Sequence, residues 1–162
     1  MTIWYTHIES PIDRILLTSD GESLTGLHMI EHRHYEVLTD DWKRDDNIKP
    51  FAESREQLAA YFAGELSEFD LPLKMTGTEF QKRVWQELQK IPYGVTISYG
   101  ELAKRIGNPN SSRAVGLANG HNPISIIVPC HRVIGANGKL TGYGGGIKRK
   151  EWLLAHETKH PA

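Results

Sequence analysis

The residues best suited to covalent chemistry in this sequence are Cys130 and its two neighbours, His131 and Arg132. They follow Pro129 and the apolar run Ile126–Val128, so the thiol is expected in a dry environment. A cysteine thiol has a pKa near ~8.5 in water, and a neighbouring His or Arg is expected to lower that pKa and favour the nucleophilic thiolate. A free cysteine is more often a small buried hydrophobe. Here two titratable groups and a permanent charge stand side by side, which favours a reactive cysteine.

A second feature with a chemical use is the segment Ser111–Gly120, which is rich in small residues. It is predicted to be helical, yet it contains Gly116, and glycine in a helix costs about 1 kcal/mol relative to alanine. Small residues let another surface approach closely, either a neighbouring core helix or the minor groove of DNA, which is about 6 Å wide. Arg113 is the only basic residue of the segment. A lone cation among small residues is suited to probe a groove or a stacked base, which favours DNA.

The formal net charge of −1 conceals an asymmetry between the two halves of the chain. Residues 1–76 contain 7 Lys/Arg and 15 Asp/Glu, whereas residues 77–162 contain 12 Lys/Arg and 5 Asp/Glu. A basic half that carries Cys130 indicates a polyanionic partner, with nucleic acid as the first candidate. The alternative is a dipolar protein whose two halves attract each other.

The length of 162 residues suffices for one domain or two small ones. The single cysteine excludes an intramolecular disulfide and a zinc site built from several cysteines. It is typical of a reducing compartment, so we expect a cytoplasmic protein. We expect neither a signal peptide nor a membrane segment, because no basic and apolar leader pattern and no apolar run of spanning length is present.

The first half is predicted to form strands and then a helix. Residues 2–8, 15–19 and 24–29 have strand composition and are separated by turn residues. Residues 31–50 are polar and charged and are predicted to form a loop. Apolar residues then recur at helical spacing over residues 51–62. We therefore predict an N-terminal sheet-plus-helix domain over residues 1–72 and a linker over residues 73–77.

The second half, residues 78–162, is predicted to be rich in helices. A capping box, Thr78–Gln81, begins a helix that runs to Ile91, and a second box, Ser98–Glu101, begins a short helix that ends at Gly107. A third helix covers residues 111–119. The last two helices have helix-turn-helix spacing, although many core helix pairs share it. The fold class is thus α/β with two domains, the second containing a helix-turn-helix.

Three further predictions concern the end of the chain. Cys130 and His131 are treated as part of a strand, which would point their side chains to opposite faces unless the backbone turns at Pro129. Gly135–Gly138 is predicted to form a hairpin turn. The chain is predicted to close with a helix over residues 147–157.

Together these motifs resemble those of the O6-alkylguanine-DNA alkyltransferases, which repair alkylated guanine. The resemblance covers residues 77–162 almost without interruption, and the first half looks like the more variable domain of the family. The motifs that carry the resemblance are Ile91-Pro92-Tyr93-Gly94, Ser98-Tyr99, Arg113-Ala114-Val115-Gly116, Asn122-Pro123, Pro129-Cys130-His131-Arg132-Val133-Ile134 and Tyr143-Gly144-Gly145. The cysteine motif together with the Arg-Ala-Val-Gly helix is highly specific.

The resemblance implies a role for each candidate catalytic residue. Cys130 would accept the alkyl group, His131 would act as the base through a bridging water, and Glu157 would orient His131. Tyr99 would donate a hydrogen bond to guanine N3. Asn122 would brace the turn around the active site.

The resemblance also implies how the DNA is held. Arg113 would fill the base stack after the target base has been flipped out through the minor groove. Tyr143 and Gly144 would pack on the flipped base, with the Gly144 N–H near O6. Further residues placed at the DNA or the base are Ser111, Ser112, Ala114, Gly116, Arg132 and Val133.

The implied reaction is an irreversible transfer of the alkyl group from O6-alkylguanine, and from O4-alkylthymine, in double-stranded DNA to Cys130. DNA is the alkyl donor, so no cofactor and no metal are expected. Some relatives hold zinc through Cys and His in the N-terminal domain, and this chain lacks those cysteines. Self-association on DNA is a further expectation. Gly144 and Ser125 stand where Ser and Pro occur in some relatives, which leaves the range of accepted alkyl groups open.

Two other functions fit parts of the sequence. A thiol hydrolase would use Cys130 and His131 and would turn over on an ester or a peptide, but a DNA-binding helix has no use in it. A damage-sensing or regulatory helix-turn-helix protein would bind DNA without chemistry, as relatives with Trp in place of the acceptor cysteine do. The presence of Cys130, His131, Tyr99 and Glu157 together argues against it.

Overall fold

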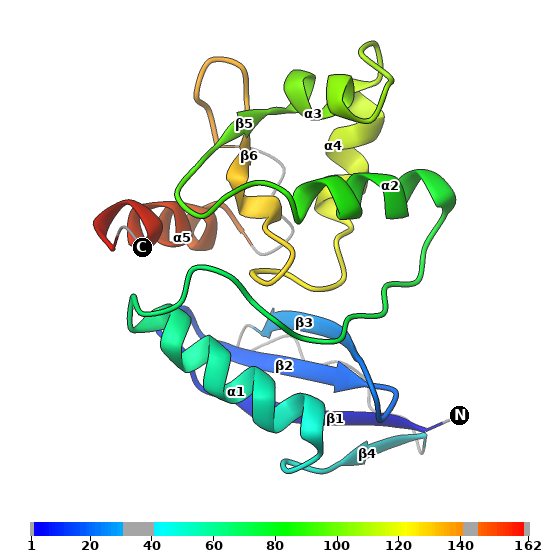
Figure 1. The fold of residues 1–162 in the computed structure, drawn as a ribbon, viewed down its shortest axis with the longest axis vertical. Coiled ribbons are helices and arrows are strands. Elements are labelled where there is room, and N and C mark those ends of the chain that lie inside the picture. Colours follow the sequence, from blue (N-terminus) through cyan, green and yellow to red (C-terminus); the bar gives the residue numbers. More distant parts are fainter. Residues whose placement is uncertain (1, 31–40, 141–145, 161–162) are drawn as a thin grey trace. The chain divides into compact units, whose positions relative to one another are not determined.

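The computed structural model describes residues 2–30, 41–140 and 146–160 (Figure 1). The chain divides into two compact units, one built from Met1–Met75 and the other from Thr76–Pro161. The first combines a sheet with a helix and the second is rich in helices, which confirms the predicted α/β class with two domains. The change of unit falls inside residues 73–77, the segment that the sequence assigns to a linker.

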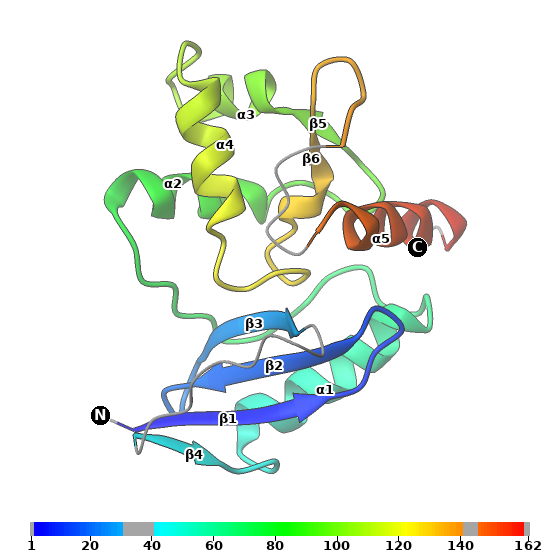
Figure 2. The same cartoon turned by 180° about the vertical axis from the view of Figure 1, so that it is seen from behind.

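The first unit is a four-stranded sheet with one helix along one of its faces (Figures 1 and 2). Strands β1 (Ile3–Ile8), β2 (Arg14–Ser19) and β3 (Leu24–Ile30) form an antiparallel meander. Strand β4 (Trp42–Arg44) joins the other edge in parallel with β1, so the order is β3-β2-β1-β4. Helix α1 (Lys49–Phe62) buries an apolar side. The core of this unit includes Ile15, Leu16, Leu17, Leu27, Phe51, Leu58 and Tyr61.

The prediction of a loop over residues 31–50 is wrong at its downstream end, where β4 and the first residues of α1 lie. Strand β4 has three residues, too few to show an alternating pattern, and it exists because β1 offers a free edge for pairing. Helix α1 begins at Lys49 rather than Phe51. Pro50 suits the first turn of a helix, because the backbone N–H that proline lacks would have no partner there.

Residues 72–74 pack beside strand β3 as part of the first unit. The Leu24 N–H donates to the Pro72 carbonyl at 2.8 Å, and the Lys74 N–H donates to the Leu24 carbonyl at 2.9 Å. These bonds continue the edge of the sheet by one isolated bridge, between Leu24 and Leu73. The upstream end of the predicted linker is therefore ordered by backbone pairing.

The second unit contains the four helices α2 (Glu79–Leu88), α3 (Tyr99–Arg105), α4 (Ser112–Gly120) and α5 (Ile147–Lys159) among its described residues. Helix α4 packs against both α2 and α3, so the predicted helix-turn-helix is formed by α3 and α4. Two short strands, β5 (Ile97–Ser98) and β6 (Val133–Ile134), pair in parallel. The turn η1 (Cys130–Arg132) directly precedes β6.

Local hydrogen bonds explain why α2 and α3 begin where they do. The Thr78 hydroxyl accepts from the Gln81 N–H, and the Gln81 side chain accepts from the Thr78 N–H, which confirms the capping box. The Ser98 hydroxyl caps α3 by accepting from the Glu101 N–H at 3.0 Å. The buried Trp85 then ties α2 to the end of α4, because its indole N–H donates to the Ala118 carbonyl at 2.9 Å.

The assignment of Cys130 and His131 to a strand is wrong, whereas the turn predicted at Gly135–Gly138 is present. Cys130 and His131 lie on a 3-10 turn instead of a strand, so the alternation of side chains expected for a strand does not apply to them. Gly135–Gly138 does turn, with the Gly138 N–H donating to the Gly135 carbonyl at 2.9 Å. The Gly135 N–H also donates to the Lys139 carbonyl at 2.8 Å, so the two arms of this turn are joined by a backbone hydrogen bond. The second arm would continue into residues 141–145, which lie outside the described residues.

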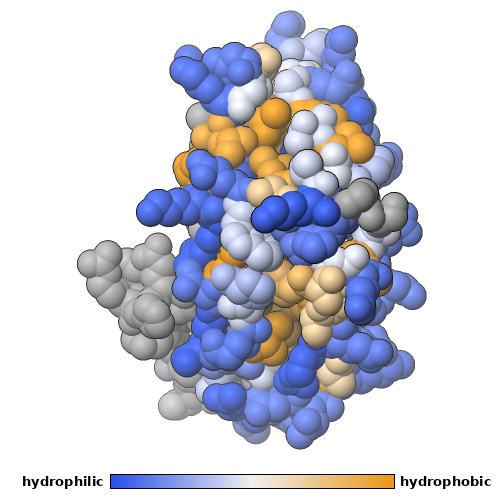
Figure 3. Space-filling model, turned by 90° about the vertical axis from the view of Figure 1, so that its left-hand side faces the viewer, coloured by the Kyte–Doolittle hydropathy of each residue, from blue (hydrophilic) through white to orange (hydrophobic). Residues whose placement is uncertain are grey.

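On the face drawn in Figure 3, apolar residues form several separate areas that are surrounded by hydrophilic residues. No helix within the described parts of the chain is both long and apolar enough to cross a membrane.

Candidate active site

Cys130 is held at the start of η1 by an irregular segment that precedes it. In this segment Ile126 has a φ of 72°, which is rare for a β-branched residue. The Asn122 side chain braces the segment from inside: its Nδ2 donates to the Val128 carbonyl at 2.8 Å, and its Oδ1 accepts from the Ile124 N–H at 3.1 Å. Cys130 itself is 3% exposed. The candidate nucleophile therefore sits in a rigid, nearly dry position.

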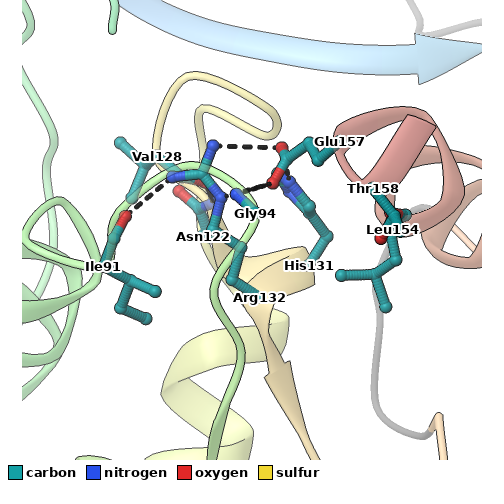
Figure 4. A network of polar contacts seen from close by, with 9 residues as sticks. All are labelled: Ile91, Gly94, Asn122, Val128, His131, Arg132, Leu154, Glu157 and Thr158. Atoms are coloured by element: carbon teal, nitrogen blue, oxygen red, sulfur yellow. Dashed lines mark hydrogen bonds and ion pairs between the residues drawn. The ribbon is translucent and has the colours of Figure 1, made fainter. Parts of the chain in front are cut away.

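His131 and Arg132, which follow Cys130 directly in sequence, form a buried polar network with Glu157 (Figure 4). Glu157, on α5, accepts from His131 Nε2 at 2.7 Å and from two nitrogens of the Arg132 guanidinium at 2.8 and 3.0 Å. The Gly94 N–H adds a fourth hydrogen bond at 3.1 Å. Arg132 also donates to the Ile91 carbonyl at 2.7 Å. A buried carboxylate with four donors has the hydrogen bonds that it needs to remain ionised in the interior.

The protonation states within the network follow from these contacts. Burial alone would raise the pKa of Glu157, but the hydrogen bonds from His131 and Arg132 outweigh it and hold that pKa well below its usual range. Burial lowers the pKa of His131, although the Glu157 hydrogen bond opposes this, so the imidazole is neutral near pH 7. A carboxylate only accepts, so Nε2 carries the imidazole proton and Nδ1 keeps its lone pair.

Nδ1 of His131 is buried and has no hydrogen-bond partner among the described residues. A buried acceptor without a donor costs free energy, and water is the usual partner at such a position. Nδ1 is thus the atom of this residue that is available to take a proton. This fits the base role that the resemblance implies, which requires a water between His131 and the thiol.

The prediction that neighbouring cations lower the pKa of Cys130 is wrong for the structure as it stands. Burial raises the pKa of the thiol to about 11, and the opposing effects of an Asn122 hydrogen bond and the Lys150 charge are smaller. The guanidinium of the adjacent Arg132 is bound to Glu157. Cys130 is therefore a protonated thiol at rest, and a base has to remove its proton for reaction.

Lys150 is a site residue that the sequence interpretation missed. It lies on α5, it is fully buried, and its Nζ donates to the Val133 carbonyl at 2.5 Å. Burial lowers its pKa to about 8, and a thiolate at Cys130 opposes that change once it forms. A lysine is almost never fully buried without a specific reason. The only sequence signal was the basic run Lys148–Lys150, which reads equally well as an exposed helix start.

Tyr99 lies between Lys150 and helix α4. Its ring is 5.8 Å from Lys150 Nζ, within the range of a cation–π contact. A Cβ built on Gly116 of α4 would lie 3.8 Å from the same ring, which is ordinary van der Waals contact. A larger residue would therefore not clash with the described neighbours of Gly116. The small residue leaves room for a surface that is not part of the described chain.

The outer side of α4 carries the residues predicted to contact DNA. Ser112, Arg113 and Ala114 are exposed, and Ser111 and Gly116 are half-buried. Leu117, one turn after Arg113, is 67% exposed, which is unusual for a large apolar side chain. The helix therefore presents a cation and an apolar side chain on one side.

Two residues predicted to contact DNA lie in the interior. Arg132 is buried and its guanidinium is bound to Glu157 and to the Ile91 carbonyl, so this arrangement does not support a DNA contact for it. Val133 is also buried, within β6, and its carbonyl accepts from Lys150. Tyr143 and Gly144 lie outside the described residues.

The fold and the site define a class of protein: two α/β units, the second of which joins a helix-turn-helix to a buried cysteine beside a His–Glu pair. A model of the 6-O-methylguanine DNA methyltransferase DNA binding domain matches residues 79–159. A model of the ribonuclease-like domain of the same methyltransferases matches residues 3–75. The chain therefore belongs to the 6-O-methylguanine DNA methyltransferase family.

Individual relatives agree over nearly the whole chain. A methylated-DNA–protein-cysteine methyltransferase of Mycolicibacterium paratuberculosis is 57% identical over 158 residues, 98% of this chain and 94% of that protein. One from Methanosarcina acetivorans is 55% identical over 155 residues, 96% of this chain and 98% of that protein.

Solved structures agree as well. The crystal structure of Mycobacterium tuberculosis O6-methylguanine methyltransferase has a TM-score of 0.90 and 55% identity, covering 99% of this chain and 96% of that one. The structure of Mycobacterium tuberculosis OGT in complex with DNA has a TM-score of 0.88 and 57% identity, covering 97% of this chain and 94% of that one.

Proposed function

We propose that this protein repairs alkylated DNA by a single, irreversible transfer of the alkyl group from O6-alkylguanine to its own Cys130. The observation that carries the proposal is the pairing of a buried thiol with a neutral histidine. Nε2 of that histidine is hydrogen-bonded to Glu157, and Nδ1 has no hydrogen-bond partner among the described residues. The same unit contains the helix-turn-helix, and a relative of 57% identity has been solved with DNA. Thymine alkylated at O4 is the second substrate of the proposal.

The proposed chemistry balances without a cofactor. The proton of the Cys130 thiol passes through a bridging water to His131 Nδ1. The sulfur then attacks the carbon attached to O6, so that an S–C bond forms and the C–O6 bond breaks, with its electron pair passing to the guanine. The guanine takes up one proton from solvent and His131 returns one to solvent, so that charges and protons balance. Tyr99 donates a hydrogen bond to N3 of the departing guanine. The product is a thioether, which water does not readily hydrolyse, so each protein molecule reacts once.

The charges around Cys130 favour the deprotonated sulfur once the proton has left. The Lys150 ammonium and the Asn122 amide both lower the pKa of Cys130, against the larger effect of burial. Glu157 holds one negative charge nearby, but Arg132 neutralises it through two hydrogen bonds. The thiolate of Cys130 is thus stabilised by the positive charge of Lys150 and by a hydrogen bond from Asn122. The negative charge of Glu157 opposes it less than a free carboxylate would, because Glu157 is paired with Arg132.

DNA recognition is assigned to the outer side of α4. The exposed Arg113 stands where it can enter the base stack, and the small residues around it allow the helix to approach the minor groove. In this proposal Arg113 fills the space of the flipped base, while the base comes to lie beside Tyr99 and Cys130.

Self-association on DNA belongs to the same proposal. The acidic first half and the basic second half of the sequence allow one copy to attract the oppositely charged half of the next. Binding to long duplexes should then be cooperative and should lose cooperativity at high salt.

The decisive experiment is intact mass spectrometry after mixing the protein with excess duplex that contains O6-methylguanine. One methyl group should be added to Cys130 and the reaction should then stop. Cys130→Ser should still bind the duplex and remain unmodified. Repeated turnover, or an acyl adduct from an ester, would instead indicate a thiol hydrolase. DNA binding without any adduct would indicate a regulatory protein.

A further inference from the structure

Asn119 is a buried amide in the last turn of α4 that the proposed reaction does not use. It is 1% exposed, and its Nδ2 donates to the backbone carbonyl of Cys130 at 3.3 Å. Its Oδ1 is also buried and has no hydrogen-bond partner among the described residues. The side chain is therefore only half satisfied inside the core.

A half-satisfied amide is a poor choice for stability alone. Leucine has the same branched shape and would leave no buried acceptor without a donor. A residue that lowers stability at a buried position needs another explanation. Within the described part of the chain, the hydrogen-bond partner of this side chain is the backbone carbonyl of the nucleophile Cys130.

The carbonyl that Asn119 binds belongs to the peptide that joins Cys130 to His131. It accepts a second hydrogen bond, from the Val133 N–H. Two donors on one carbonyl fix the plane of that peptide. The direction of the Cys130 side chain depends on that plane, because the Cys130 Cα lies in it. Asn119 therefore acts on the direction in which the thiol points.

Helix α4 carries Asn119 and Arg113 on one rigid element. Six residues separate them, which is about 9 Å along a helix axis. The end that carries Asn119 is itself held, because Trp85 donates to the Ala118 carbonyl and the Asn122 N–H donates to the Asn119 carbonyl at 3.3 Å. A shift of α4 is thus transmitted to the Cys130–His131 peptide by a direct contact.

We propose that Asn119 is a positioning residue that locks the Cys130–His131 peptide to α4, so that docking of this helix on DNA sets the orientation of the thiol toward the alkyl group. The inference rests on the proposed function, because it assumes that α4 docks on DNA and that Cys130 is the acceptor. Misplacement of reacting atoms by a fraction of an ångström slows a displacement strongly. Loss of this hydrogen bond should therefore affect the rate of transfer more than the binding of DNA.

The test is Asn119→Leu, compared with the unaltered protein in four measurements. The rate of methyl transfer from an O6-methylguanine duplex at saturating protein should fall about tenfold. The dissociation constant for the duplex should change less than about twofold, because the outer side of α4 is untouched. The melting temperature should stay equal or rise. Alkylation of Cys130 by iodoacetamide, which needs no docked helix, should change less than about twofold.

Val115→Ala is the matched control, because Val115 is an apolar residue that is buried in the same helix and takes no part in the hydrogen bonds described above. It should lower the melting temperature and leave the transfer rate of the folded protein nearly unchanged. Asn119→Ser, which cannot reach the Cys130 carbonyl, provides a second variant if leucine prevents folding, and the same slow transfer is expected of it.

The proposal is overturned if folded Asn119→Leu and Asn119→Ser transfer methyl groups as fast as the unaltered protein. It is also overturned if their transfer and iodoacetamide rates fall together. Failure of the proposed function would look different, because the unaltered protein itself would then transfer nothing.

Discussion

The described residues of the two units bury polar groups of different kinds. In the first unit these are the hydroxyls of Thr6, Thr18, Ser19 and Ser54, each with a hydrogen-bond partner. In the second unit they are two amides and five ionisable or permanently charged side chains: Asn119, Asn122, His131, Arg132, Lys150, His156 and Glu157. Burial of a hydroxyl with a partner is cheap, whereas burial of a charge is expensive even when it is paired.

This difference separates a unit built mainly for folding from a unit that also holds chemistry. Apolar side chains of the same volume would stabilise a core at least as well as the Arg132–Glu157 pair does. Two of these groups, His131 and Arg132, follow Cys130 directly in sequence, and both bind Glu157. The second unit thus keeps an arrangement that costs stability, and the cost falls where the reaction is proposed.

The largest expected effect comes from Glu157→Gln, which leaves the buried Arg132 without its anionic partner. The free energy of unfolding of the second unit should fall by about 3–5 kcal/mol, measured by denaturant titration. Ser54→Ala, in the first unit, removes one neutral hydrogen bond and should cost about 1 kcal/mol. If both variants lost the same free energy of unfolding, the buried polar groups of the two units would not differ in their energetic cost.

Acid should act on the same carboxylate. The pKa of folded Glu157 is held below its unfolded value of 4.5. Its contribution to stability is therefore fully present above about pH 4.5 and is lost as the pH falls through the lower folded pKa. Between pH 6 and pH 3 the melting temperature of the unaltered protein should fall more steeply than that of Glu157→Gln.

The next effect concerns the outside of the second unit, where Arg113 is exposed and Cys130 is not. Extrusion of a base costs a few kcal/mol, so Arg113→Ala should slow transfer from duplex O6-methylguanine by about 10- to 100-fold. Transfer from free O6-benzylguanine should change little, since no base has to leave a stack. Single-turnover rates with both substrates test this. Equal slowing of both in a folded variant would refute the assignment of Arg113 to base flipping.

A smaller effect is expected from the buried Lys150. Its folded pKa of about 8 lies below its unfolded value of 10.5, so the unfolded state binds more protons above pH 8 and stability rises with pH. Lys150 alone contributes a rise of about 1 kcal/mol between pH 8 and pH 9. The Cys130 thiol, with an unfolded pKa of 9.0 and a folded pKa of about 11, offsets part of that rise in the same range. Lys150→Met should lack the rise in denaturant titrations at the two pH values. A rise that persists in this variant would assign it to another group.

The smallest effect concerns surface charge. Lys104, exposed on α3, should contact a phosphate if the helix-turn-helix docks on DNA. Lys104→Gln should then reduce the slope of log affinity against log salt by about 1. Lys43→Gln, an exposed change in the first unit, is the control and should leave the slope unaltered. Affinity that does not depend on salt would mean that the charge asymmetry serves another purpose.

Local patterns in the sequence determined most of the helices and the identity of the chemical groups. The capping box at Thr78 and the cap at Ser98 depend on residues three positions apart, so their spacing alone predicts where α2 and α3 begin. The strands of the meander follow in the same way from composition and turn residues. The Cys130 motif and the Arg113 helix are short and specific, so they could be recognised without any fold.

The tertiary structure alone decided how those groups are paired. Arg132 was predicted at DNA, but it binds Glu157, which is 25 residues away and on another element. Lys150 belongs to the site because α5 packs its side chain against Val133. Strand β4 forms because it pairs with β1, which is far away in sequence. The pKa of Cys130 is raised instead of lowered, because the effect of burial on the thiol is larger than the effect of nearby charges and hydrogen-bond donors. Spacing encodes contacts within a helix or a turn, whereas desolvation and ion pairing depend on the path of the whole chain.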